Sequence, residues 1–180
     1  MAVMEFYVSA DEVWYASESG MHPLIEGSAV VDAVDERIRE LYPKADVALS
    51  RCYERSAANA RFFRFLRVRR FCKCNFGALD NTRMDVDTGV FNIEAVPCPL
   101  RGECPWEGVI CLPEMDTRLS EAEVRVMRLL CDGMSNIEIA NELFLSPNTV
   151  KRHVSTAYVK TRTRNRAEFV RFASDNSIFI

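Results

Sequence analysis

Residues 119–173 carry four helix start signals, and these constrain the fold of the chain more than any other feature. In three of them a small polar residue is followed three positions later by a glutamate, beginning at Ser120, Ser135 and Asn165. Such a polar side chain accepts a hydrogen bond from a backbone amide of the first turn, while the glutamate bonds back to the amide of the first residue. Ser146 before Pro147 is the fourth start, because proline suits the first helical turn. The sequence therefore predicts four helices, at about 121–132, 136–143, 147–160 and 166–174.

The apolar residues of these segments recur with the period of a helix. In 147–160 they are Val150, Val154, Ala157 and Tyr158, so the polar residues of this segment lie on its outer face. The link 144–146 has the length of the turn in a helix-turn-helix motif, whose second helix enters the major groove of DNA. We therefore expect 147–160 to be a recognition helix.

The residues of this region resemble the LuxR/GerE-type helix-turn-helix domain. The resemblance rests on the following residues in this order: Leu119, Ser120, Glu123, Val126, Met127, Leu130, Gly133, Ser135, Asn136, Glu138, Ile139, Ala140, Leu143, Ser146, Thr149, Val150, Lys151, His153, Asn165 and Arg166. Sigma factors carry a similar helix-turn-helix, but His153 and the run to Asn165 favour the LuxR type. The family usually has Lys-Leu where this chain has Lys160-Thr161, which predicts looser packing at the end of the recognition helix.

The resemblance implies a sequence-specific, DNA-binding transcriptional regulator that is not an enzyme. Double-stranded DNA is the expected partner, and a homodimer is expected because paired half-sites multiply the interaction of a small reading head. In this family the last helix commonly contributes to the dimer, here with Phe169, Val170 and Phe172. Two sets of residues are expected to contact DNA: Asn148, Lys151, Arg152 and Ser155 near the base edges, and Thr149, Arg162, Arg164 and Arg166 near the phosphates.

The charge of the chain is distributed unevenly. Residues 118–180 hold 10 Lys/Arg against 7 Asp/Glu, a net charge of +3, whereas residues 1–117 hold 13 against 19, a net charge of −6. The basic end is the one expected to meet phosphates. We predict an N-terminal domain over 1–112, a linker over 113–118 and the helix-turn-helix domain over 119–180.

The first part of the N-terminal domain is predicted to be a helical lead-in. Apolar residues at helical spacing indicate one helix over 27–42, ended by Pro43, and a second over about 45–57. The run 58–76 mixes arginines with phenylalanines, which fits nucleic-acid binding. It fits better a helix whose Phe62, Phe65, Leu66 and Phe71 pack inward, while the cations stay solvated and neutralise the acidic remainder. The fold class is therefore mainly α (α+β), with N-terminal helices and one small hairpin.

A cluster of cysteines follows this run. Cys98, Cys104 and Cys111 lie on one stretch, with Cys72 and Cys74 about two dozen residues before them. Four thiolates complete the coordination of zinc and leave no open position, so the cluster predicts a structural zinc site. We choose Cys74 over Cys72, because Cys74 opens a turn. Free buried cysteines and an iron–sulfur cluster are the alternatives.

Between these cysteines, 84–96 is predicted to be a β-hairpin around the turn 87–89. So small a sheet has little core and needs a further stabilising cross-link, which a bound zinc ion would provide. The cysteine segments followed by a LuxR-type domain resemble a group of uncharacterised transcriptional regulators of Bacteroides-like bacteria. This resemblance implies no particular chemistry for the N-terminal domain, which shows neither a phospho-receiver nor an acyl-homoserine-lactone pattern.

Two other functions compete with the leading one. The cysteine module could be a protein-interaction adaptor for RNA polymerase or another regulator, or a redox or metal sensor that changes DNA affinity. An enzyme is disfavoured by two histidines, no glycine-rich phosphate loop and a closed metal site. The N-terminus lacks the pattern of a secretory signal and no apolar run approaches 18 residues, so we expect a cytoplasmic protein without membrane contact.

Overall fold

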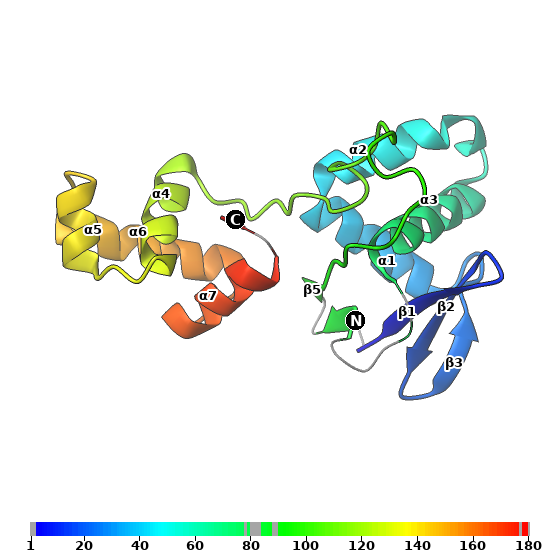
Figure 1. The fold of residues 1–180 in the computed structure, drawn as a ribbon, viewed down its shortest axis with the longest axis horizontal. Helices are drawn as coiled ribbons and strands as arrows, with labels where there is room; N and C mark the ends of the chain where they lie inside the picture. The colour runs from blue at the N-terminus through cyan, green and yellow to red at the C-terminus, as the bar shows by residue number, and fades with distance from the viewer. Residues whose placement is uncertain (1–2, 78, 80–83, 88–89, 177, 180) are drawn as a thin grey trace. The chain divides into compact units, whose positions relative to one another are not determined.

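The computed structural model describes residues 3–77, 79, 84–87, 90–176 and 178–179. The chain divides into two compact units, Met1–Glu114 and Met115–Ile180, and the division falls inside the segment predicted as a linker, 113–118 (Figure 1). In the described residues, no helix combines the length and the apolar character needed to cross a membrane. Each unit is described separately below.

The N-terminal unit begins with a three-stranded antiparallel sheet, where the sequence predicted only a helical lead-in. Its strands are β1 (Glu5–Ser9), β2 (Glu12–Ser17) and β3 (Gly20–Pro23), in the order β1-β2-β3. Phe6 pairs with Tyr15. The prediction missed this sheet because the β1–β2 turn is made by Ala10 and Asp11, both at positive φ (49° and 66°), without the glycine that usually signals such a turn.

Three helices follow the sheet. α1 (Ala29–Leu41) starts at Ser28, whose side chain accepts a hydrogen bond from the Val31 amide, and the predicted helix 27–42 is confirmed. α2 (Pro43–Cys52) begins at the proline that ends α1, and a short 3-10 helix (Glu54–Ser56) completes the second predicted helix. α3 (Ala60–Asn75) is the arginine- and phenylalanine-rich run.

Aromatic rings from distant parts of the chain form the core of this unit. The ring centroids of Phe6 and Phe76 are 5.3 Å apart, and Phe91 lies 5.5 Å from Phe71 and 6.1 Å from Tyr42. Phe91 belongs to β5 (Val90–Phe91), which pairs with β4 (Val86–Asp87). The predicted hairpin is thus present, but its strands are shorter than 84–96, and two of its turn residues, 88 and 89, lie outside the described residues.

The cations of α3 face acidic residues of the same unit. Arg64 pairs with Asp32 (3.1 Å), while Asp11 receives both Arg69 (3.0 Å) and Lys73 (2.5 Å). This arrangement favours the neutralising role over nucleic-acid binding. Two details of that prediction were wrong. Arg67 is buried between Asp35 and Asp46 and not solvated, and Phe62 is 38% exposed and does not pack inward.

The C-terminal unit contains the four predicted helices. They are α4 (Glu121–Cys131), α5 (Asn136–Glu142), α6 (Pro147–Thr161) and α7 (Arg166–Asp175). The helices share one apolar core: Val126, Met127, Leu130, Ile139, Ala140, Val150, Val154, Ala157, Phe169 and Ala173. The predicted reciprocal caps are confirmed at Ser120 and Ser135. At the third start Glu168 instead accepts a bond from the Arg164 amide (2.8 Å), one residue before the N-cap Asn165.

Candidate nucleic-acid interface

The turn between α5 and α6 has the geometry of a helix-turn-helix connection. Phe144 takes a left-handed backbone conformation (φ 54°) and exposes 95% of its surface. This bend lets the Leu145 amide donate to the carbonyl of Ala140 (2.9 Å), which satisfies a carbonyl at the end of α5. Ser146 then accepts a bond from the Thr149 amide (3.1 Å), and α6 begins.

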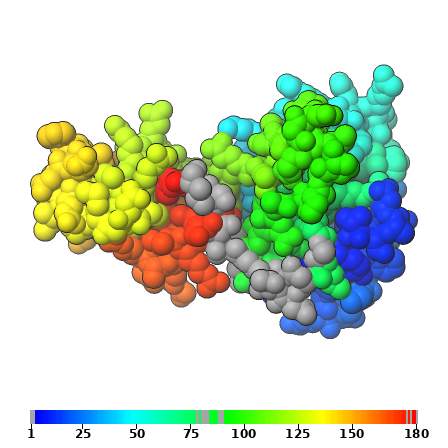
Figure 2. Space-filling model, in the orientation of Figure 1, coloured from blue at the N-terminus to red at the C-terminus, as the bar shows by residue number. Residues whose placement is uncertain are grey.

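The burial of α6 separates an inner from an outer face. Val150, Val154 and Ala157 are buried in the core. All four residues predicted to face base edges are exposed: Asn148, Lys151, Arg152 and Ser155. In Figure 2 the yellow and orange atoms of α5 and α6 lie at the surface of this unit. The spacing of the apolar residues therefore gives α6 a polar outer face over its first turns, which ends at the exposed Val159.

The outer face of α6 carries two exposed cations, Lys151 and Arg152. Among the residues that the structure describes, Lys151 and Arg152 form no ion pair or hydrogen bond through their side chains. His153 is half-buried, consistent with a packed residue more than a base reader. Two neighbouring cations that remain available on an ordered helix are suited to phosphates and to the acceptor edge of guanine.

The residues predicted to meet phosphates have less uniform surroundings. Arg164 is exposed and pairs with Glu168 (3.0 Å), and the Thr149 hydroxyl lies 2.8 Å from that of Ser146. Arg162, which ends α6 at φ 56°, is exposed. The two arginines are thus accessible to a phosphate, and Thr149 is half-buried.

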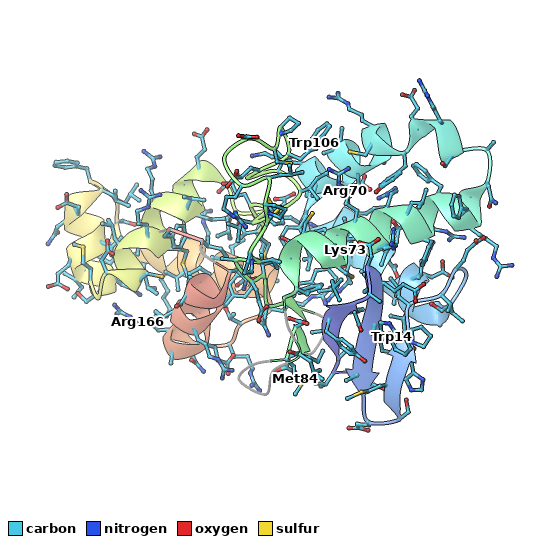
Figure 3. All side chains as sticks on the ribbon, turned by 45° about the vertical axis from the view of Figure 1, so that its right-hand side comes forward. Trp14, Arg70, Lys73, Met84, Trp106 and Arg166 are labelled. Carbon is cyan, nitrogen blue, oxygen red and sulfur yellow. The ribbon has the colours of Figure 1, made fainter. Side chains whose placement is uncertain are left out.

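Arg166, predicted to meet a phosphate, also makes contacts inside the C-terminal unit. Its guanidinium donates to the carbonyls of Leu130 (2.6 Å) and Met134 (3.0 Å), and so it caps the end of α4 from the start of α7 (Figure 3). These bonds use two of the five N–H donors of the guanidinium and fix its position, and the half-buried side chain keeps further donors for a phosphate. No local signal could have found this contact, because 32 and 36 residues separate the partners.

An ion pair links the end of α6 to the start of α4. Lys160 Nζ donates to Glu123 Oε2 (2.7 Å), and the same oxygen accepts the Ser120 amide (2.8 Å). Burial raises the pKa of Glu123, but these hydrogen bonds outweigh burial and leave the pKa below its usual value. Thr161, expected to loosen this end, is buried and donates to the Ala157 carbonyl (2.8 Å). The end of α6 is therefore held by polar contacts.

The predicted zinc ligands lie in the N-terminal unit and line one pocket of about 300 Å³: Cys74, Cys98, Cys104 and Cys111. Cys72 is 1% exposed and is not part of this lining. Burial raises the pKa of the Cys74 thiol, nearby Arg70 opposes this, and the thiols of the other three cysteines raise it further. Among the described residues, no three His, Cys, Asp or Glu side chains are already arranged to hold a metal ion.

Comparison with known proteins identifies the C-terminal unit. Residues 117–173 match the model of the luxR family of bacterial regulatory proteins. The chain is 41% identical over 56 residues to a probable transcriptional regulator, ycf29, of Cyanophora paradoxa, covering 31% of this chain and 27% of the relative. It is also 41% identical over 58 residues to the CsgBAC operon transcriptional regulatory protein of Escherichia coli, covering 32% of this chain and 27% of the relative.

A third similar protein is the Fimbriae Z protein of Escherichia coli, 42% identical over 57 residues, or 32% of this chain and 27% of the relative. The chain thus spans about a quarter of the length of these relatives. The family model begins at residue 117 and does not reach the cysteine segments, so the resemblance of the N-terminal part to Bacteroides-like regulators stays a prediction. The matched family is described as one of bacterial regulatory proteins. Residues 117–173 are a luxR-family helix-turn-helix domain of the bacterial regulatory proteins.

Proposed function

We propose that the protein is a cytoplasmic, sequence-specific transcriptional regulator in which α6 reads the major groove of double-stranded DNA. The observation that carries this proposal is the pair of exposed cations on α6, Lys151 and Arg152, neither of which is engaged by a described side chain. The net charge of +3 over residues 118–180 favours approach to the phosphate backbone. Arg152 is assigned to a base edge and Lys151 to a base edge or an adjacent phosphate.

The test begins with a selection of bound duplexes from a random DNA pool by the full-length protein. Affinities of Lys151→Ala and Arg152→Ala are then measured on the selected site, on single-base variants of it and at several salt concentrations. Loss of a bidentate base contact costs about 1–3 kcal/mol and relaxes specificity at one position, whereas loss of a phosphate contact weakens all sequences alike. Arg125→Ala is the matched control, because Arg125 is an exposed arginine on α4.

We infer a homodimer on DNA through α7. Val170 of α7 is 36% exposed and Phe172 is half-buried, so both are available to a second copy. Phe169, which was predicted to join this surface, belongs to the core and is not available. Val170→Glu is expected to weaken the binding of two copies to a paired site, as measured by light scattering of the complex. If only one copy of the wild-type protein binds the paired site, the inferred dimer is contradicted.

The N-terminal unit is proposed to orient or regulate the helix-turn-helix domain. An interaction with RNA polymerase or another regulator, and a redox or metal response, are the competing roles of this unit. Full-length protein and residues 115–180 are compared for affinity and site preference. Equal values exclude positioning and dimerisation as roles of the N-terminal unit, while a loss in the shorter chain supports one of them.

A further inference from the structure

The cysteine-lined pocket brings together two parts of the chain that the sequence separates. Cys74 lies in the last turn of α3, whereas Cys98, Cys104 and Cys111 lie on the segment 97–112, which contains no helix or strand. In Figure 2 this segment, drawn in green, covers the surface of the N-terminal unit. The four thiols therefore lie where this segment meets the end of α3.

Asn75 places Cys111 next to Cys74. The buried Asn75 amide donates to the Ile110 carbonyl (2.8 Å) and accepts the Leu112 amide (2.9 Å) through its oxygen. These bonds hold the residues on both sides of Cys111 against the residue that follows Cys74. The buried hydrogen bonds of Asn75 thus hold Cys111 near Cys74.

Tight turns place Cys98 and Cys104 in the lining of the same pocket. The Arg101 amide donates to the Cys98 carbonyl (3.1 Å), and the Cys104 amide donates to the Leu100 carbonyl (2.9 Å). Glu107 closes this part of the loop, because it accepts the Gly102 amide (2.6 Å) and pairs with Arg101 (3.2 Å). The backbone that carries Cys98 and Cys104 is therefore defined before any ligand binds.

We propose that these four side chains bind one zinc ion as thiolates: Cys74, Cys98, Cys104 and Cys111. All four are free thiols that line one pocket, and none is fully buried. Four sulfur ligands satisfy tetrahedral zinc at about 2.3 Å each and leave no position for water or substrate. The site is therefore structural: it fastens the segment 97–112 to the end of α3.

Two features of the pocket suit such a site. Its lining is largely apolar, with Val8, Phe76 and Pro97 among its residues, and this limits the access of water to the ligands. Four thiolates around one Zn²⁺ retain a net negative charge, and cationic groups offset it: Arg70 interacts electrostatically with Cys74, and Arg101 lines the pocket. Figure 3 labels Arg70 on α3 and Trp106 on the loop.

Binding requires the thiols to turn towards a common point, because the described side chains are not yet arranged around one. Rotation of a half-buried cysteine between staggered rotamers keeps the backbone in place. The backbone contacts of Asn75 and of the loop supply the preorganisation that the side chains lack. Cys72 is excluded from the ligand set, because it is packed in the core and does not line the pocket.

The first measurement uses the full-length wild-type protein, purified under reducing conditions. Its metal content is determined by elemental mass spectrometry, and we expect one zinc per chain. The metal is then removed with a chelator and replaced by Co²⁺. Tetrahedral thiolate ligation is expected to give intense visible bands together with sulfur-to-cobalt charge transfer. A protein without bound zinc and with only the pale spectrum of hydrated Co²⁺ would overturn the proposal, as would iron with a sulfide-dependent visible spectrum.

The second measurement assigns the ligands. Serine is placed separately at each of the four positions, and the same change at Cys52 and Cys131 provides matched controls, because both are free, half-buried cysteines outside the pocket. The four variants are expected to lose zinc or to hold it far more weakly against a chelator, while the controls retain it. Equal retention in Cys98→Ser and Cys104→Ser would overturn the assignment. Since the cobalt spectrum of the wild-type protein needs no variant, misfolding of a serine variant leaves the test intact.

Discussion

Lys160 at the end of α6 and Glu123 at the start of α4 meet at 2.7 Å, on the same carboxylate oxygen that accepts the Ser120 amide. The Glu123 side chain exposes only 7% of its surface. One carboxylate thus serves both as the return bond of a helix cap and as the partner of the recognition helix. This arrangement couples the start of the domain to the helix proposed to read DNA.

Replacing Lys160 with methionine is expected to destabilise the C-terminal unit by about 1–2 kcal/mol, because it leaves a largely buried carboxylate without its cation. Urea unfolding of the full-length protein, followed by the amide NMR signals of α4 and α6, measures the change. The control is Arg164→Met, which breaks an ion pair whose arginine is 86% exposed and should therefore change the stability far less, because solvent screens exposed pairs. Equal stability of the two variants would contradict this role of Glu123.

The C-terminal unit is expected to lose stability in acid. The pKa values of Glu123, Glu138 and Glu168 lie below their usual range in the folded protein, mainly because each carboxylate accepts hydrogen bonds that outweigh its burial. Their stabilisation is complete above the unfolded pKa of about 4.3 and is lost as pH falls through the lower folded values. Unfolding free energies at pH 6 down to about pH 3 check this, and Glu123→Gln should flatten the profile. If the unfolding free energy of that variant depends on pH as steeply as that of the wild-type protein, Glu123 does not contribute to the loss of stability in acid.

Arg166→Ala is expected to lower the stability of the C-terminal unit by about 2–4 kcal/mol. Its guanidinium bonds two carbonyls at and after the end of α4, and a hydrogen bond to a charged group contributes about 1.5–3 kcal/mol net of its exchange with water, less where the group is partly exposed as here. Lys151→Ala, on the exposed face, should leave stability nearly unchanged and weaken DNA binding. If Arg166→Ala unfolds like the wild-type protein and only reduces the salt dependence of DNA binding, then Arg166 is a phosphate contact as the sequence suggested.

Asn75→Ala is expected to loosen the segment 97–112 and to cost about 2–4 kcal/mol in the N-terminal unit, because three backbone groups lose their partner in a buried place. Trp106 lies on this segment, so its fluorescence and the proteolysis of the loop report the change. Asn75→Asp keeps the acceptor for the Leu112 amide but sets a buried carboxyl group against the Phe71 and Ile110 carbonyls, so at neutral pH it should cost at least as much as Asn75→Ala. An unaltered loop in both variants would show that other contacts hold it.

Local signals in the sequence were sufficient to define the C-terminal unit. Ser120, Ser135 and Ser146 each cap a helix with bonds that reach only three residues along the chain. Such interactions are encoded by neighbouring residues, and therefore they could be predicted without knowledge of the fold. The apolar spacing of α6 likewise determined which of its residues face the core and which face solvent.

Features that depend on contacts between residues far apart in the sequence were decided only by the tertiary structure. The sheet β1–β3 was missed because its first turn has no glycine, and its pairing depends on packing against α3. The choice of Arg166 as a cap depends on carbonyls more than 30 residues away. Cys72 and Cys74 are two positions apart on one helix and so point to different faces. Sequence spacing indicates that one of them can join the other cysteines, and only the packing of α3, which buries Cys72 in the core and leaves Cys74 at the pocket, decides which one.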